Sequence, residues 1–183
     1  MPSELLPEAV TNLLRSTRYI HLATCRDNIP HVSLMIFTYY RDEANDYILF
    51  STPKNTTKYQ NIVANPNVSM LVHDWTTSGP HEQASNDDLD TSGRRNSLYE
   101  LLTNLNRNEI SSVSVMINGK AQVIDESAEK FDFYRSLHAN NNLEDPGAKN
   151  FVDGSDNALV VLKIDSAKVT DVDNNIQEYQ GRK

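Results

Sequence analysis

The sequence is short of cysteine and glycine, and it has no surplus of positive charge. Its single cysteine, Cys25, excludes an intramolecular disulfide framework and is typical of a reducing compartment. Its six glycines form neither a phosphate-binding loop nor a G-x-S-x-G motif. The chain therefore lacks the sequence motifs of P-loop nucleotide-binding enzymes and of hydrolases with a catalytic triad. The formal net charge of −8 argues against nucleic acid and anionic membranes as partners, because both attract basic surfaces.

Long apolar runs are also missing. No run reaches membrane-spanning length, and the opening residues, MPSELLPEAV, lack the basic region of a signal peptide. The five histidines show no metal-ligand spacing, so we expect no metal site. At 183 residues and 38% hydrophobic content, the chain fits one globular domain with a sizeable core. We therefore expect a single domain over residues 1–183 in a cytoplasmic protein.

Short β-prone runs dominate the chain. We expect strands at residues 19–25, 31–40, 47–50, 68–72, 111–124, 157–164 and 167–172. Helices are expected to start at Ser3, with Pro7 early in the helix, near Tyr59, and after Asp125 or Ser127. The first three strands follow one another as a meander, and no regular βαβ alternation appears. This pattern favours a mainly β (α+β) fold, an antiparallel barrel or sheet with peripheral helices.

An insertion at about residues 75–110 interrupts the strand pattern. Residues 76–95 contain one leucine and no aromatic residue, which is typical of a surface loop. Asn96 then caps a short helix with four leucines at helical spacing. Two interpretations stay open: a solvated excursion, or a flap over a ligand site or part of a subunit interface.

The turn after Phe50 has no acidic residue. Residues 47–73 contain no Asp or Glu, and residues 51–58 combine hydroxyl groups with Lys54 and Lys58 at the start of a helix. Lysine at that end of a helix is unfavourable by about 0.3–1 kcal/mol, and a bound anion would reverse the sign of this effect. The alternative is that Thr56 or Thr57 is only a helix cap and that both lysines lie in solvent. These residues alone leave both interpretations open.

Three segments in this order carry a family resemblance: YIHLATCRDNIPHVSLMIF, ILFSTPKNTTKYQNIVANPNVSMLV and SVSVMINGKAQVI. Together they resemble the pyridoxamine 5'-phosphate oxidase-like family of FMN-binding split barrels, and in particular its fungal branch, which carries a long insertion at the same place. The resemblance spans Pro7 to Val172. It implies an antiparallel split β-barrel with peripheral helices, and a homodimer that holds FMN at its interface.

The resemblance also implies which residues contact FMN. Lys58 matches the lysine that holds the FMN phosphate, and Thr57 stands where authentic oxidases usually carry an arginine. Ser51 and Thr52 match a strand-end pair that contacts the flavin. Further implied contacts are Ser33, Leu34 and Met35 on the strand along the flavin ring, and Ser114, in place of a family glutamine, with its same-face neighbour Ser112.

One departure from the family bears on the reaction. From Leu159 onwards the chain has no tryptophan and only Arg182, whereas authentic oxidases use tryptophan and arginine there to contact flavin and substrate phosphate. The resemblance therefore implies an FMN-dependent oxidoreductase of unknown substrate rather than a vitamin B6 oxidase. No catalytic residue is implied. The alternative is a non-catalytic binder of flavin, heme or a deazaflavin.

Overall fold

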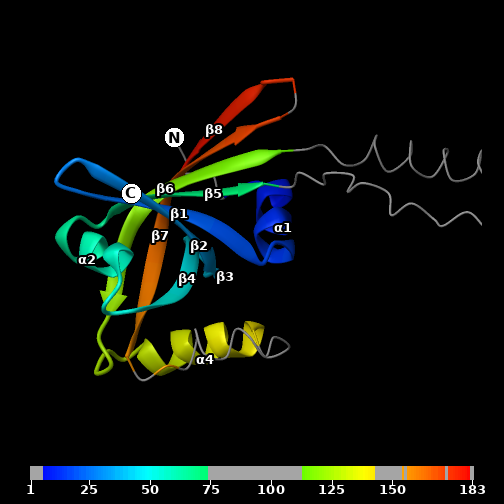
Figure 1. Cartoon of the computed structure of the whole chain (residues 1–183). Helices are drawn as coiled ribbons and strands as arrows, with labels where there is room; N and C mark the ends of the chain where they lie inside the picture. Colours follow the sequence, from blue (N-terminus) through cyan, green and yellow to red (C-terminus); the bar gives the residue numbers. More distant parts are fainter. Residues whose placement is uncertain (1–5, 74–112, 143–153, 155, 172, 182–183) are drawn as a thin grey trace, which may run out of the picture.

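The computed structural model describes residues 6–73, 113–142, 154, 156–171 and 173–181 (Figure 1). These residues form eight strands and three helices. The helices are α1 (Glu8–Ser16), α2 (Thr57–Ala64) and α4 (Phe131–Asn141). The strands are β1 (Tyr19–Arg26), β2 (Ile29–Ile36), β3 (Thr38–Arg41), β4 (Asp46–Pro53), β5 (Asn67–His73), β6 (Ser114–Ile124), β7 (Asn157–Thr170) and β8 (Ile176–Gln180). The expected leucine helix after Asn96 lies outside the described residues, as does Ser112.

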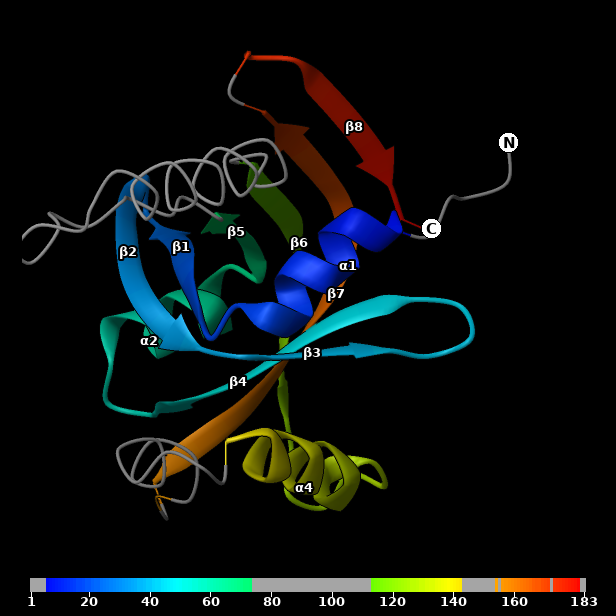
Figure 2. The same ribbon diagram turned by 90° about the vertical axis from the view of Figure 1, so that its right-hand side faces the viewer.

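All the strands belong to one antiparallel sheet. Its order is β2-β1-β5-β6-β7-β4-β3, with β8 beside β7. Only Phe37 separates β2 from β3, yet β2 pairs with β1 while β3 pairs with β4. The two edges of the sheet are therefore consecutive parts of one stretch of chain, which curls the sheet into an open barrel (Figure 2). The predicted mainly β (α+β) fold, an antiparallel split barrel with peripheral helices, is confirmed.

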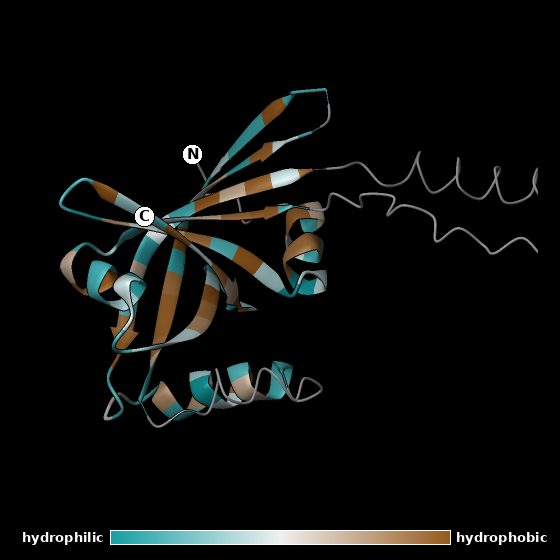
Figure 3. Cartoon of the chain, viewed as in Figure 1, coloured by the Kyte–Doolittle hydropathy of each residue, from teal (hydrophilic) through white to brown (hydrophobic). Residues whose placement is uncertain are grey.

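The core fills the inside of this curled sheet. Side chains of alternate strand residues point inward and are fully buried, among them Ile20, Leu22, Ile48, Phe50, Ile117 and Leu162. Helix α1 adds Leu13 and Leu14 to this core. A second, smaller cluster joins Tyr134 of α4 to the opposite face of β4 and β7. Figure 3 shows hydrophobic stretches along the strands and on α4.

The longest strand pair bends at a glycine. Within the continuous strand β6, the register against β7 shifts between Asn118 and Gly119. A Cβ atom at position 119 would lie 2.2 Å from the carbonyl oxygen of Lys163 and 2.9 Å from the side chain of Leu162. No side chain fits at that distance, so the close approach of β6 and β7 requires glycine.

Several predicted element boundaries are wrong. The strand expected at residues 31–40 is two strands, β2 and β3, separated at Phe37. The helix expected after Asp125 or Ser127 begins at Phe131, and Ser127 instead donates a hydrogen bond to Asp125 in the turn before it. The two strands expected at residues 157–164 and 167–172 are one strand, β7, because the bulge opposite Gly119 lets pairing continue. The edge strand β8 was missed because its residues are mostly polar and exposed. Helix α1 begins after Pro7, whose backbone is extended, so Pro7 precedes the helix rather than lying in it.

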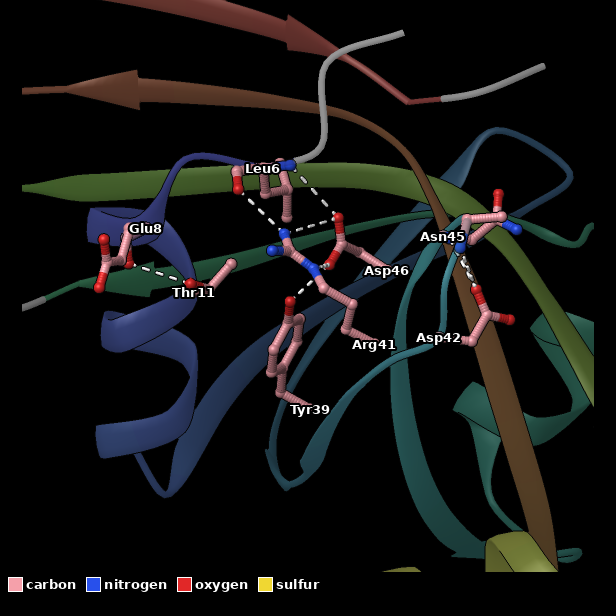
Figure 4. Close-up of polar contacts among 9 residues, drawn as sticks. Leu6, Glu8, Thr11, Tyr39, Arg41, Asp42, Asn45 and Asp46 are labelled. Carbon is pink, nitrogen blue, oxygen red and sulfur yellow. Dashed lines mark hydrogen bonds and ion pairs between the residues drawn. The ribbon is translucent and has the colours of Figure 1, made fainter.

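A buried carboxylate ties α1 to the β3–β4 hairpin (Figure 4). Asp46, which is 6% exposed, accepts hydrogen bonds from the Tyr39 hydroxyl and from Arg41 Nε at 2.6 Å. It also accepts from the backbone N–H of Leu6 at 3.3 Å, and Arg41 donates to the carbonyl oxygen of Leu6 at 2.9 Å. Burial and the bond to Asp46 raise the pKa of Tyr39 above its ordinary value. This cluster fixes the chain just before α1.

We predict that Asp46→Asn lowers the free energy of unfolding by about 3 kcal/mol, because it removes one partner of a buried ion pair. Asp27→Asn is the matched control, since the Arg26–Asp27 pair is exposed and 3.7 Å long. It should change stability by less than about 0.5 kcal/mol. Urea unfolding at constant m-value measures both, and equal midpoints for the two variants would contradict the assignment.

Candidate functional site

Two threonines shape the turn that leads into α2. Thr56 is the helix cap, and its Oγ1 accepts a hydrogen bond from the N–H of Tyr59 at 3.4 Å. The same hydroxyl donates to the carbonyl oxygen of Pro53 at 2.8 Å. The hydroxyl of Thr52, 3.0 Å away, must therefore donate to Thr56, because Thr56 has only one proton. Thr52 is fully buried, so this pair fixes the conformation of the turn.

Lys58 occupies the first turn of α2 without a counter-charge. Its side chain is half-buried, and this burial lowers its pKa. The first turn holds no acidic residue, and Lys58 forms no ion pair with any residue that the structure describes. The N–H groups of Thr57 and Lys58 precede the first hydrogen bond within the helix, so they too point toward an acceptor at this end. A desolvated cation beside open amides is an arrangement that suits a phosphate.

The side chain of Lys54 lies in a different environment from that of Lys58. Lys54 is exposed, and its backbone N–H donates to the carbonyl oxygen of Asp156 at 3.1 Å. Thr57 is exposed as well. The cap and the cationic site coexist in this turn, so the two interpretations of the sequence do not exclude each other.

The face of β2 beside α2 carries polar atoms without partners. Asn61 of α2 donates to Thr24 of β1 at 3.1 Å, and Thr24 pairs with His31, so His31 and Ser33 lie on the side of the sheet that α2 covers. His31 Nδ1 and Ser33 Oγ are buried and have no hydrogen-bond partner in the described part of the chain. An unpaired buried polar group costs about 1–3 kcal/mol, so a polar ligand here would be stabilising. Met35, on the same face, is 7% exposed and belongs to the core.

The opposite face of the sheet, which we call the outer face, carries four exposed apolar side chains among polar ones. Leu34 pairs with His21, His21 with Leu71, and Leu71 with Met116, so this row crosses four adjacent strands. Leu34, Leu71 and Met116 are 57%, 40% and 38% exposed. Val32, in the next row, is 63% exposed. The outer face is defined here by Val32, Leu34, His21, Leu71, His73, Ser114 and Met116.

Ser51 faces a third environment. Because side chains alternate along β4, Ser51 points away from the side occupied by Thr52. Its Oγ lies 3.4 Å from Nε2 of His138 on α4. The sequence did not indicate His138 as a site residue, although it lies seven residues after Phe131 and shares the buried face of α4 with Tyr134.

The residues implied by the resemblance thus fall into separate groups. Thr52, Thr57, Lys58 and Ser33 lie around α2, whereas Leu34 and Ser114 lie on the outer face. Ser51 lies beneath α4, and Met35 lies in the core. No group of three or more His, Cys, Asp or Glu side chains among the described residues is arranged to hold a metal ion. None of the described helices is long and apolar enough to span a membrane.

A family model and a curated relative that match this chain carry the same description. The family model described as pyridoxamine 5'-phosphate oxidase matches residues 6–173. A Schizosaccharomyces pombe protein named a pyridoxamine 5'-phosphate oxidase homolog is 38% identical, over 98% of this chain and 93% of its own.

Two solved structures share the fold at low sequence identity. One is an FAD-binding protein from Mesorhizobium loti, with a TM-score of 0.56, 16% identity, and coverage of 92% of this chain and 97% of that one. The other is a heme-binding protein from Mycobacterium smegmatis, with a TM-score of 0.59, 15% identity, and coverage of 97% and 60%. At such identities the likeness concerns the fold alone.

We predict that inorganic phosphate stabilises this protein through Lys58. At ten times its dissociation constant, phosphate should add about 1.4 kcal/mol to the free energy of unfolding. Lys58→Met should remove this effect and leave the phosphate-free protein at least as stable, because it deletes a desolvated charge. Thermal unfolding with and without phosphate measures both, with Lys54→Met as the control that keeps the response. An undiminished response in Lys58→Met would place the anion elsewhere.

Proposed function

This chain belongs to the pyridoxamine 5'-phosphate oxidase-like family, and from that premise we propose that it is a flavoprotein that binds FMN. The observation that carries the proposal is the half-buried Lys58, which lacks a counter-charge among the described residues at the start of α2. The description of the Mesorhizobium loti neighbour as FAD-binding supports a flavin as the ligand class. The phosphate of FMN supplies the anion that this turn lacks.

The residues present fit the phosphate end of FMN. Lys58 and the N–H groups of Thr57 and Lys58 would hold the phosphate, and the Thr52–Thr56 hydrogen bond would keep the turn rigid. Ser33 offers a hydroxyl without a partner among the described residues on the strand that the resemblance places along the ring. When bound, FMN itself supplies the redox chemistry, while these residues bind it, orient it and limit its contact with water.

We further propose that the protein forms a homodimer through the outer face. Exposed apolar side chains on β2, β5 and β6, with His21 of β1 between them, are typical of an interface rather than of a free surface. Leu34 and Ser114, two implied flavin contacts, lie on this face and not beside Lys58. A second copy packed there would bring such residues toward the flavin of its partner, and a two-fold axis would repeat the site.

The proposed reaction class is oxidation or reduction of a small molecule by FMN. Vitamin B6 oxidation is not proposed, because residues 159–183 contain no tryptophan and only one arginine, Arg182. The purified protein with FMN should therefore not oxidise pyridoxamine 5'-phosphate.

The second candidate is non-catalytic binding of heme, flavin or a deazaflavin. The stacked His21 and His73 rings on the outer face, with centroids 5.9 Å apart, favour heme over a deazaflavin, because imidazole is an iron ligand. The heme-binding neighbour from Mycobacterium smegmatis has the same fold.

We predict that the purified protein shows flavin absorbance, directly or after incubation with FMN. Lys58→Glu should weaken FMN binding at least about a hundredfold, because a like charge replaces a charge-assisted phosphate contact. Riboflavin, which lacks the phosphate, should bind the wild-type and Lys58→Glu proteins equally weakly. The control, Lys54→Glu, should bind FMN as the wild type does. Absence of flavin absorbance would refute the proposal, and a heme Soret band in its place would establish the second candidate.

We also predict that Leu71→Lys on the outer face yields a monomer by light scattering at micromolar concentration and weakens FMN binding. Burying an unpaired charge in an apolar interface is strongly unfavourable. Val63→Lys is the control, because Val63 is 62% exposed but lies on α2. A wild-type monomer, or a Leu71→Lys dimer, would remove the outer face from consideration.

A further inference from the structure

A cavity of about 270 Å³ is lined by residues of α4, β4 and β7. Helix α4 lies across the ends of these strands (Figure 1). The polar inner lining of the cavity comes from Ser51, His138 and Asn157. Phe131 and Leu159 provide apolar walls. Ser51 points away from the side of β4 that faces the α2 turn, so this cavity is separate from the phosphate site proposed above.

His138 is held in one orientation inside this cavity. It is 2% exposed, and its Nδ1 lies 2.9 Å from the hydroxyl of Thr38. Thr38 also accepts a hydrogen bond from Asn141 at 3.2 Å, and Asn142 Nδ2 lies 3.5 Å from the same ring nitrogen. The other ring nitrogen, Nε2, lies 3.4 Å from the hydroxyl oxygen of Ser51. The proposed flavin site makes no use of this network.

Two opposite charges line the same cavity without pairing. Arg135 lies one turn after Phe131 on α4, and Glu126 lies between β6 and α4. Both are exposed, and no ion pair joins Arg135 to Glu126 or either of them to another described residue. Neither charge is neutralised by a residue that the structure describes. A ligand of one sign would satisfy one residue and be repelled by the other.

We propose that this cavity binds a small zwitterion of the free amino acid type. The carboxylate meets Arg135, and the ammonium group meets Glu126. The apolar walls Phe131 and Leu159 enclose the carbon chain. The volume limits the ligand to a small molecule, since typical ligand pockets begin at about 300 Å³. A polar group at the end of the side chain reaches Ser51 and His138.

The test screens the full-length protein against pools of the twenty protein amino acids by saturation-transfer NMR and measures the affinity of any hit by calorimetry. The hit is then compared with its carboxamide, which lacks the carboxylate, and with its N-acetyl derivative, which lacks the ammonium group. Each analogue should bind at least about tenfold more weakly. Failure of every amino acid to bind saturably, or equal affinities for the hit and its analogues, overturns the proposal.

Two variants test which group of the ligand Arg135 and Glu126 each bind. Arg135→Gln should abolish the discrimination against the carboxamide, and Glu126→Gln should abolish the discrimination against the N-acetyl derivative. Glu129→Gln, a neighbouring exposed acid that does not line the cavity, is the matched control and should bind as the wild type does. Lys58→Glu should keep amino acid binding while losing FMN, which separates this proposal from the flavin proposal. Unchanged discrimination in both lining variants would overturn it.

Discussion

The architecture depends on one continuous stretch of chain, residues 29–41, that forms both edges of the sheet. Its first half pairs with β1 and its second half with β4, with Phe37 between them. Because one segment must reach both edges, the sheet has to curl, and its inner face becomes the core. The connection from β4 to β5 then has to cross the end of the curled sheet. Helix α2 makes that crossing, and its Asn61 donates a hydrogen bond to Thr24 of β1.

Local sequence patterns predict much of this fold. The alternation in residues 31–40 predicts Val32 and Leu34 on one face and Ser33 and Met35 on the other, and their exposures agree. Asp27 and Asn28, which join β1 to β2, both have positive φ, a conformation that these residue types tolerate in a two-residue hairpin turn. Local sequence patterns do not predict strand bounds that depend on pairing with a strand distant in the sequence. Nothing within residues 157–172 indicates that the chain stays paired across a bulge, because the partner glycine lies some forty residues earlier.

The candidate site is predictable only in part, for a related reason. The acid-free turn identifies Lys58, but only the structure shows that burial desolvates Lys58 and leaves Lys54 in solvent. Ser51 and Thr52 are adjacent in sequence and chemically alike, yet β4 turns one toward α4 and the other toward the helix cap. Side-chain alternation predicts opposite faces, but it cannot say what covers each face. His138 and Ser51 are 87 residues apart, a separation that no local pattern spans.

Position 119 can accommodate only glycine. The sheet on one side of it carries the outer face, and the strand pair on the other side reaches toward α4. With the carbonyl oxygen of Lys163 only 2.2 Å from the place of a Cβ atom, every other residue type would force the two strands apart there. The spacing of β6 and β7 at this point therefore depends on a single residue, Gly119.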